Sequence, residues 1–558
     1  MKGIIRQPCD EGVIRSGAAD APCPPKAGPW ILAATILGSS MAFIDGTVVN
    51  VALPTLQAHL NATAVDVQWV IEAYSLLLAA LLLAGGSLGD IYGRKRIFAT
   101  GVVLFAAASA WCGLARSVDE LILARAVEGV GGALLVPGSL AIIGASFSEG
   151  ARGRAIGTWS GFLGVATALG PVLGGWLIEH ASWRWIFFIN LPLAIATLTF
   201  TLLHVPESRN PNAASGLDWP GTALVTAGLG GVVYGLIESS SLGWTNSYVL
   251  GSLAIGAVAL LAFILVEARS RAPMLPLSLF RSWDFSGANL LTLLLYSALS
   301  GSLFFLPLNL IQVQGYSATA AGGALLPFII LTSLLSRWSG GLVDRYGART
   351  PLIVGPALAS AGFVLFALPS IGGSYWTTWF PAISMLGLGM AISVAPLTTT
   401  VMNSVGQQQS GIASGINNAV ASVAEVLAIA VLGTVMLGAF NRQLTGRLVN
   451  ASVTPGVMQR LEDQRLKLAA AEIPAEVSGD TKALVKRSID ESFVAGYRRI
   501  MLIAAALAMC AAVSAGLTIG RGGLKIKGAP NTANAAREGD RNGITSPGGR
   551  PVRIEPRS

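Results

Sequence analysis

The sequence predicts an all-α integral membrane protein that crosses the bilayer with fourteen helices. Of its 558 residues, 53% are hydrophobic and only 12% are charged, whereas a soluble domain carries about 25% charged residues. The apolar residues fall in repeated blocks of about twenty, the length that a helix needs to cross ~30 Å of hydrocarbon. Both observations argue against a water-soluble core.

The apolar blocks follow one another along the chain in two series. The first series comprises residues 30–52, 67–89, 97–115, 119–146, 155–178, 185–204, 218–237 and 247–267. The second comprises residues 286–310, 319–340, 350–370, 376–402, 411–438 and 497–520. Residues 1–29 and 521–558 contain no such block and are predicted to be tails outside the bilayer.

The distribution of basic residues predicts that both termini are cytoplasmic. Basic residues in short loops stay on the cytoplasmic side of a membrane. Among the short loops, those after even-numbered spans hold most of these residues, and those after odd-numbered spans hold only Arg116 and Arg184. We therefore expect a multi-pass protein of the cell membrane, here a bacterial inner membrane.

The net charge of +8 does not indicate nucleic-acid binding, because much of it lies in the tail 521–558. This tail either contacts anionic lipid or only aids solubility, and both alternatives stay open.

The sequence predicts no cofactor and no enzyme activity. Its three histidines and four cysteines are scattered without the spacing of a metal or haem site. A GxxxxGK[ST] phosphate loop and a grouped nucleophile and base are absent from the sequence. The energy for any pumping would therefore come from an ion gradient or from a partner protein.

An internal repeat divides the chain into two similar halves. GSLGDIYGRKR, from Gly86 to Arg96, matches GGLVDRYGART, from Gly340 to Thr350, at a constant offset of 254 positions. Spans one to six therefore recur as spans nine to fourteen. Two facing six-helix bundles enclose a central cavity whose access can alternate.

The repeat predicts the domain organisation. The first bundle comprises residues 30–204 and the second comprises residues 284–520. Residues 205–283 form an insertion of two helices with cytoplasmic linkers. We expect the extracytoplasmic loop 439–496 to contain two short amphipathic helices outside the bilayer.

Several motifs resemble those of a known family. DIYGRKR resembles the signature loop of the major facilitator superfamily, and LILARAVEGVGGA in span four is similar to its LxxxRxxQGxGxA pattern. Span five resembles the antiporter motif GxxxxxxxxGxxxGPxxGG, with Ala166 at the middle glycine. Its matching residues are Gly157, Gly170, Pro171, Gly174 and Gly175.

Together with FIDGTVVNVALP, WRWIFFINLP and fourteen spans, these motifs are similar to those of the fourteen-helix drug:proton antiporters. The resemblance covers residues 30–520. It implies a proton-coupled exporter of amphipathic small molecules or drugs. In span five, the proline predicts a bend and the glycines predict close helix packing.

Asp45 is the first candidate for proton coupling. A carboxylate near the bilayer centre costs ~2.5–3.5 kcal/mol and needs a partner, water or a proton. The helical rise places Asp45 ~10 Å below the outer end of span one and Arg125 ~9 Å below the outer end of span four. Glu72 shares this level. A movement that separates Asp45 from Arg125 would favour protonation of the acid, and a permanent structural pair is the alternative.

Glu128 stands where the resembled family usually has glutamine. It lies three residues from Arg125, on the same helix face, and can neutralise that arginine in place of Asp45. The proton site therefore stays open among Asp45, Glu72 and Glu128.

The repeated loop predicts an acid-to-base latch at the cytoplasmic mouth, with topology alone as the alternative. Its candidate residues are Asp90, Gly93, Arg94 and Arg96 in the first copy, and Asp344, Gly347 and Arg349 in the second.

Glu425, near the middle of span thirteen, is a candidate for the substrate cavity. It either attracts a cationic substrate or bonds to a polar neighbour, and we weigh these two readings equally. Phe43 and Tyr296 are aromatic candidates for an apolar lining.

The sequence thus predicts a proton-coupled exporter that works in the lipid bilayer on small amphipathic substrates. Export of one endogenous metabolite, such as a siderophore, a lipid precursor or an antibiotic, is the alternative, followed by a membrane sensor without transport. The sequence does not identify a periplasmic adaptor.

Overall fold

The structure is a computed structural model. It describes residues 27–147, 149–209, 217–270, 273–405, 410–450, 453–474, 477 and 479–520. The basic tail 521–558 and residues 1–26 lie outside these ranges.

The first six spans form a bundle of long helices. Their starts follow local capping rules: Thr63 and Asp66 form a capping box at α3, and Ser117 accepts a hydrogen bond from the backbone of Glu120 at α5. The sixth span is divided into α7 and α8. The helices are α2 (Gly28–His59), α3 (Ala64–Tyr92), α4 (Arg94–Leu114), α5 (Val118–Ser146), α6 (Glu149–His180), α7 (Trp185–Phe188) and α8 (Asn190–His204).

Two helices follow the first six spans. They are α9 (Trp219–Leu242) and α10 (Ser247–Arg269), capped by the side chains of Asp218 and Asn246. A short 3-10 helix, η1 (Leu277–Arg281), leads into the second half.

The remaining helices, from α11 to α20, build the second half. The second half contains α11 (Trp283–Leu308), which continues into a π-helical turn η2 (Asn309–Val313), α12 (Ala318–Ala324), α13 (Leu326–Gly340), α14 (Leu342–Tyr346), α15 (Arg349–Ala367), α16 (Tyr375–Thr378), α17 (Phe380–Asn403) and α18 (Ser410–Asn450). After these come α19 (Pro455–Asp463), the 3-10 helix η4 (Arg465–Ala470) and α20 (Gly479–Thr518).

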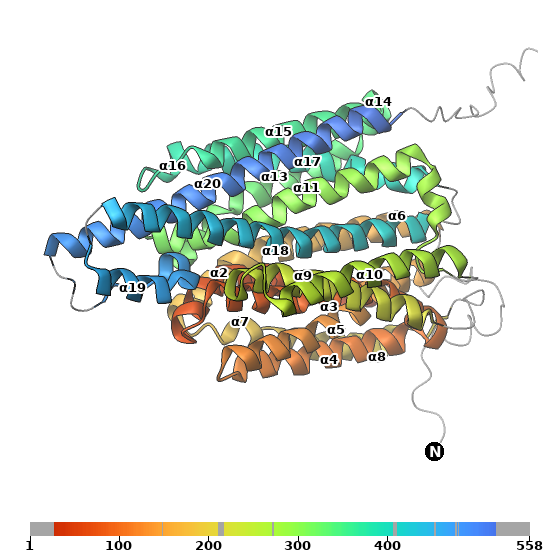
Figure 1. The fold of residues 1–558 in the computed structure, drawn as a ribbon. Helices are drawn as coiled ribbons and strands as arrows, with labels where there is room; N and C mark the ends of the chain where they lie inside the picture. Colours follow the sequence, from red (N-terminus) through yellow and green to blue (C-terminus); the bar gives the residue numbers. More distant parts are fainter. Residues whose placement is uncertain are drawn as a thin grey trace, which may run out of the picture.

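Within the described residues, 14 helical segments are long and apolar enough to cross a membrane, which confirms the predicted spans. The protein is therefore a multi-pass membrane protein. The helix α2 begins and α20 ends at the same end of the bundle (Figure 1). We call this the terminal end and the opposite one the far end.

The prediction for the loop 439–496 is wrong in one respect. Its second amphipathic segment is not a separate short helix but the first half of α20, and α18 also extends to Asn450. Val485, Ile489 and Phe493 are buried at helical spacing, and Gly496 is the only glycine or proline between Gly479 and the predicted span. The helix therefore runs straight from the loop into the bilayer.

The inserted helices connect the two halves. In Figure 1, α9 and α10 lie next to each other, and α9 packs against both α3 and α18. The Trp69 indole of α3 donates a hydrogen bond to Glu238 at 2.9 Å, and the Thr434 hydroxyl of α18 donates one to the carbonyl of Leu236 at 2.9 Å.

Candidate proton-coupling and transport site

The structure places Asp45 of α2 and Arg125 of α5 in direct contact inside the first half. The distance between Arg125 Nη1 and Asp45 Oδ2 is 2.5 Å, and both side chains are completely buried. The sequence positions of both residues predict the same depth, and the structure agrees. Their role in proton coupling stays a prediction.

Glu128 competes for the same guanidinium. Its Oε2 lies 2.8 Å from Arg125 Nη1, and its side chain is also fully buried. One positive group therefore faces two carboxylates, so the trio carries a formal charge of −1 when both are ionised and is neutral with one proton. Because burying an unbalanced charge is costly, the neutral trio with one proton is favoured while the site stays dry.

The trio is enclosed by polar and aromatic groups from four further helices. Arg125 Nε donates to the carbonyl of Val70 at 3.1 Å, and its guanidinium lies 4.2 Å from the centre of the Tyr74 ring. Asn190 of α8 donates to Ser109 of α4 at 3.0 Å, and Ser109 donates to the carbonyl of Phe187 of α7 at 3.0 Å. The neighbours of Asp45 and Glu128 include these two side chains.

Sequence reasoning missed Tyr74, Ser109 and Asn190 as members of this cluster. Asn190 could have been identified from the sequence, because a carboxamide in an apolar span needs a hydrogen-bonding partner. Ser109 could not, since serine is common in membrane helices.

Glu72 is not part of this cluster. It is completely buried, and neither of its carboxylate oxygens has a hydrogen-bond partner among the described residues. Glu425 of α18 lies close enough to repel a negative charge on Glu72, and it lies near Ser75 of α3. The structure thus groups Glu72 with the substrate-cavity candidate of the other half, whereas its depth alone suggested Arg125.

The two aromatic candidates differ in exposure. Phe43 is 39% exposed, and a Cβ added at the nearby Gly46 would have no atom within 4 Å. Open space therefore adjoins this part of α2, where Gly46 directly follows Asp45. Tyr296 is half-buried and packs against the main hydrophobic core.

The glycines of α6 hold it close to two other helices. A Cβ at Gly170 or Gly174 would collide with Thr47 or Val48 of α2, and one at Gly175 would collide with the backbone at Ala318 of α12. Gly322 of α12 packs in turn against the carbonyl of Pro171. The helix α6 therefore lies between the helix that carries Asp45 and the second half.

Gly157 does not share this packing. It lies on the same helix toward the terminal end, and an added Cβ there would have no atom within 4 Å. Among the motif glycines, close packing is thus found at Gly170, Gly174 and Gly175, nearer the far end.

Polar contacts between the two halves close the far end. Glu179 of α6 accepts hydrogen bonds from the backbone and the hydroxyl of Thr319, at 2.9 and 2.6 Å. Gln312 donates to Gln57 of α2 at 2.9 Å, and Gln68 of α3 donates to the carbonyl of Ile429 of α18 at 3.0 Å.

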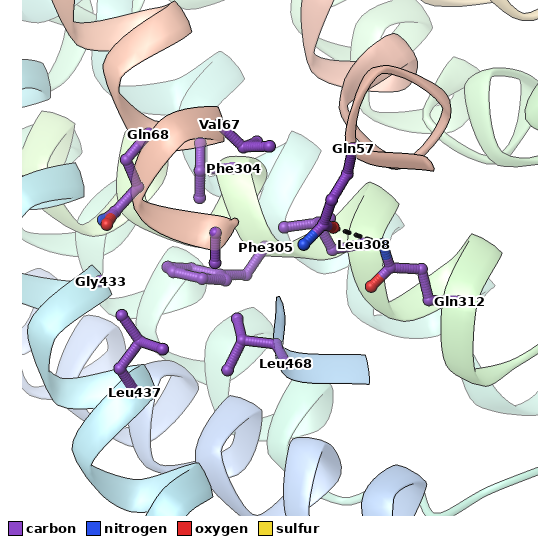
Figure 2. A pocket seen from close by; sticks show the side chains of 11 residues that line it. Gln57, Val67, Gln68, Phe304, Phe305, Leu308, Gln312, Gly433, Leu437 and Leu468 are labelled. Atoms are coloured by element: carbon purple, nitrogen blue, oxygen red, sulfur yellow. Dashed lines mark hydrogen bonds between the residues drawn. The ribbon is translucent and has the colours of Figure 1, made fainter. Parts of the chain in front are cut away.

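The segment before α20 completes this closure. Figure 2 shows Leu468 of η4 near Phe305, Leu437 and Gln57. The hollow that these residues line has a volume of only about 10 Å³. Gln57 donates to the carbonyl of Lys467 at 3.0 Å, while Lys467 Nζ donates to Asn61 at 2.6 Å. Leu468 is 2% exposed and has a φ of 54°, a conformation that leucine rarely adopts. We call η4 the far-end plug.

At the terminal end, the repeated loop joins consecutive helices. Asp90 of α3 pairs with Arg94 of α4 at 2.8 Å, across a Gly93 whose φ is 117°. Glu207 also belongs to this charged group, and it was not identified from the sequence. Its carboxylate lies 3.5 Å from Arg96 and accepts a hydrogen bond from the backbone of Lys95.

The second copy repeats the turn, because Gly347 also has a positive φ, of 72°. Arg349 donates to the carbonyl of Gly516 at 2.5 Å. The side chain of Asp344 lies outside those that the structure describes, so the predicted ion pair of this copy stays a prediction.

Comparison with known proteins gives a consistent family. Residues 35–429 match the Major Facilitator Superfamily. The chain is 32% identical over 509 residues to the tetracenomycin C resistance and export protein of Streptomyces glaucescens, covering 90% of this chain and 94% of that one. It is 34% identical over 485 residues to the multidrug resistance protein Stp of Mycobacterium tuberculosis, covering 85% and 89%.

A third relative and a solved structure agree with this family and its fold. The puromycin resistance protein pur8 of Streptomyces alboniger is 36% identical over 434 residues, covering 76% of this chain and 85% of that one. A bacterial homolog of the human lysosomal transporter Spinster, in an inward-facing and occupied conformation, has the same fold, with a TM-score of 0.58 at 18% identity over 88% of this chain and 96% of that one. The chain belongs to the major facilitator superfamily.

Proposed function

We propose that the chain is a proton-coupled antiporter that exports amphipathic small molecules, including antibiotics, across the cell membrane. The observation that carries this proposal is the buried trio of Asp45, Arg125 and Glu128, which has one more acid than base. The names of the relatives, which include antibiotic resistance, multidrug resistance and export, support the direction of transport.

The trio supplies a proton site because its balance depends on geometry. While Arg125 contacts both acids, one proton makes the group neutral. When α2 moves away from α5, Asp45 loses its positive partner and an acid in an apolar environment favours its protonated form. Return of α2 brings the guanidinium back, and the proton is released when water enters the site and solvates the second carboxylate, because the dry trio retains one proton. Whether Asp45 or Glu128 carries the proton in each step is left open by this scheme.

The helix α6 can transmit movement of the second half to this site. It contacts α12 of the second half through Gly175 and Gly322, and it contacts α2 through Gly170 and Gly174. When the halves rock apart at the far end, α6 is released from α12, and the helix that carries Asp45 loses its support.

Glu72 and Glu425 together form the site that attracts cationic substrates in this proposal. They come from opposite halves of the molecule and lie close enough to repel each other, so a bound cation would relieve this repulsion. We assign the two halves to residues 30–204 and 284–520 and the inserted helices to residues 205–283.

The orientation follows from the basic loops. With both termini cytoplasmic, the far end with its plug faces outward, and the Asp90–Arg94 and Gly347–Arg349 turns lie at the cytoplasmic mouth. No cofactor besides the proton gradient enters this scheme.

Export of a single antibiotic is the second candidate, because two relatives are named for one compound each. A panel of structurally unrelated compounds separates the two candidates. Saturable export of several compounds supports a multidrug exporter, and export of one supports a dedicated one.

The test uses everted membrane vesicles that contain the full chain. Accumulation of ethidium, puromycin and chloramphenicol is followed after a proton gradient is imposed, with and without an uncoupler. We expect gradient-dependent accumulation of at least one compound, and none in vesicles that lack the chain. Accumulation that the uncoupler leaves unchanged would overturn proton coupling, and no accumulation of any tested compound would overturn export of drugs.

A further inference from the structure

A second hollow lies at the seam between the two halves and the inserted helices. Its volume is about 370 Å³, and its walls come from α3, α9, α10, α11 and α18 together with residues just before α11. We call it the side cavity. Ligand pockets usually measure ~300–1,000 Å³, so the side cavity is large enough for a small ring system.

The side cavity belongs to the terminal half of the bundle. Its lining residues come from the last part of α3, such as Leu83, the first part of α9, such as Leu229, and the first part of α18, such as Ile416. Phe263 contributes from the last part of α10. All these segments lie toward the end where α2 begins and α20 ends.

The lining selects a largely apolar and uncharged group. Among the described residues that line it, none is charged, and the polar side chains are Ser286 and Asn289, both on α11. Asn289 is held by Asn417 of α18 at 3.1 Å, and Ser286 donates to the carbonyl of Phe280 at 2.6 Å. The Ser286 oxygen keeps a lone pair with which it can accept one hydrogen bond from a ligand.

The side cavity adjoins the acidic pair along α3. Ala79 lines the cavity, and Leu76 and Ser75 lie three and four residues before it on the same helix face. Glu72 stands one further turn along, ~10 Å from Ala79 at the helical rise. One helix face therefore leads from the apolar hollow to the proposed cation site.

The outer surface of the inserted helices indicates where a ligand would come from. Val258 and Leu261 of α10 are 65% and 63% exposed, as expected for side chains that contact lipid tails. The α9–α10 pair thus lies between the side cavity and the hydrocarbon on this side. An apolar hollow loses packing contacts unless something fills it.

We propose that the side cavity binds the apolar ring system of an exported amphipath that enters from the leaflet at the terminal end, with α9 and α10 as its outer wall. This inference rests on the proposed export function. It gives the inserted helices a role in substrate entry, and it predicts that the cavity contributes affinity without selecting for charge. A lipid acyl chain has the same chemistry and is distinguished by the test below.

The test fills the cavity after the protein has folded. Cys9, Cys23 and Cys510 are replaced by serine, and the buried Cys112 is kept. Ala419→Cys, on the cavity wall, is then modified with benzyl methanethiosulfonate in everted vesicles. Ala257→Cys, on the exposed face of α10, is the matched control. Dithiothreitol removes the benzyl group from both variants.

We expect modification of Ala419→Cys to raise the KM for both ethidium and chloramphenicol by about tenfold, which equals ~1.4 kcal/mol. Dithiothreitol should restore the original KM, and the Ala257→Cys control should not change. If the parent exports in response to the gradient and the KM of modified Ala419→Cys is unchanged, the proposal for the side cavity is overturned and the proposed function stands. A parent that exports no compound would overturn the proposed function first.

A second measurement separates substrate from lipid. Phospholipid that remains with the purified protein is counted before and after modification. Loss of bound phospholipid together with an unchanged KM would assign the cavity to an acyl chain and overturn the proposal. A raised KM with unchanged phospholipid supports it.

Discussion

Arg125 Nη1 contacts the carboxylates of both Asp45 and Glu128, and the shorter of the two contacts, 2.5 Å, is made to the residue eighty positions away in the chain. The nearer acid in sequence is therefore not the closer partner in space. This arrangement connects α2 to α5 through a single guanidinium and makes the charge of the site depend on the distance between two helices.

Asp45→Asn should abolish export driven by a proton gradient. The amide cannot release a proton, and it leaves Arg125 with Glu128 as a permanent neutral pair. Accumulation of ethidium in everted vesicles should fall to the level of vesicles without the chain. Asp119→Asn, an exposed acid in the first turn of the same helix as Arg125, is the control and should transport normally. Gradient-driven accumulation by Asp45→Asn at the level of the parent would contradict the switch.

The double variant Asp45→Asn/Glu128→Gln should be less stable than the two single variants predict together. Each single variant keeps one carboxylate for Arg125, whereas the double variant leaves a buried cation unpaired, which costs ~3–5 kcal/mol in other proteins. Thermal unfolding of the purified variants should show a coupling energy of ~0.5–3 kcal/mol. Strictly additive effects would mean that the two acids do not share the guanidinium.

Gly175→Leu should hold the far end open. A side chain at this position collides with the backbone at Ala318, so α6 and α12 cannot close against each other. Leu437→Cys, which lines the far-end closure, should then react faster with a thiol reagent that does not cross the membrane, and export should fall. Gly157→Leu makes the same change where no atom lies within 4 Å. If Leu437→Cys reacts at the same rate in both variants, the packing at Gly175 does not control the closure.

Leu468→Gly should loosen the plug without straining the backbone. Glycine adopts a φ of 54° readily, so only the side chain that enters the closure is lost. The labelling of Leu437→Cys should again accelerate. Arg465→Gly, at an exposed position of the same 3-10 helix, is the control, and unchanged labelling in Leu468→Gly would make the plug a passive cover.

Glu425→Gln should separate charged from neutral substrates. We expect the KM for ethidium to rise by about tenfold, or ~1.4 kcal/mol, because one half of the acidic pair becomes neutral. The KM for chloramphenicol, which is uncharged, should stay the same. A similar loss for both compounds would count against recognition of charge.

The fourteen spans were predictable from the sequence because an apolar block of twenty residues has few alternatives in a chain of this composition. The contact between Asp45 and Arg125 was also within reach, since residue counts along opposite helices convert directly into depth. Depth does not fix the rotation of a helix about its axis. For this reason the sequence could not tell that Glu72 faces Glu425 and not Arg125.

The far-end closure was missed for a related reason. Gln57, Gln312 and Leu468 are ordinary residues in their local sequence, and only the packing of the two halves brings them together. Leu468 in particular lies in a segment that reads as an exposed amphipathic helix. Its positive φ and its burial depend on contacts with residues more than four hundred positions earlier.

The helices α18 and α20 contain 41 and 40 residues, which corresponds to ~60 Å each at the helical rise, about twice the ~30 Å hydrocarbon thickness. The ion pair between Arg447 and Glu491 ties them together toward the far end. This rod of paired helices therefore stands clear of a detergent micelle or nanodisc. It offers an epitope for an antibody fragment and an asymmetric landmark for aligning particle images by electron cryo-microscopy.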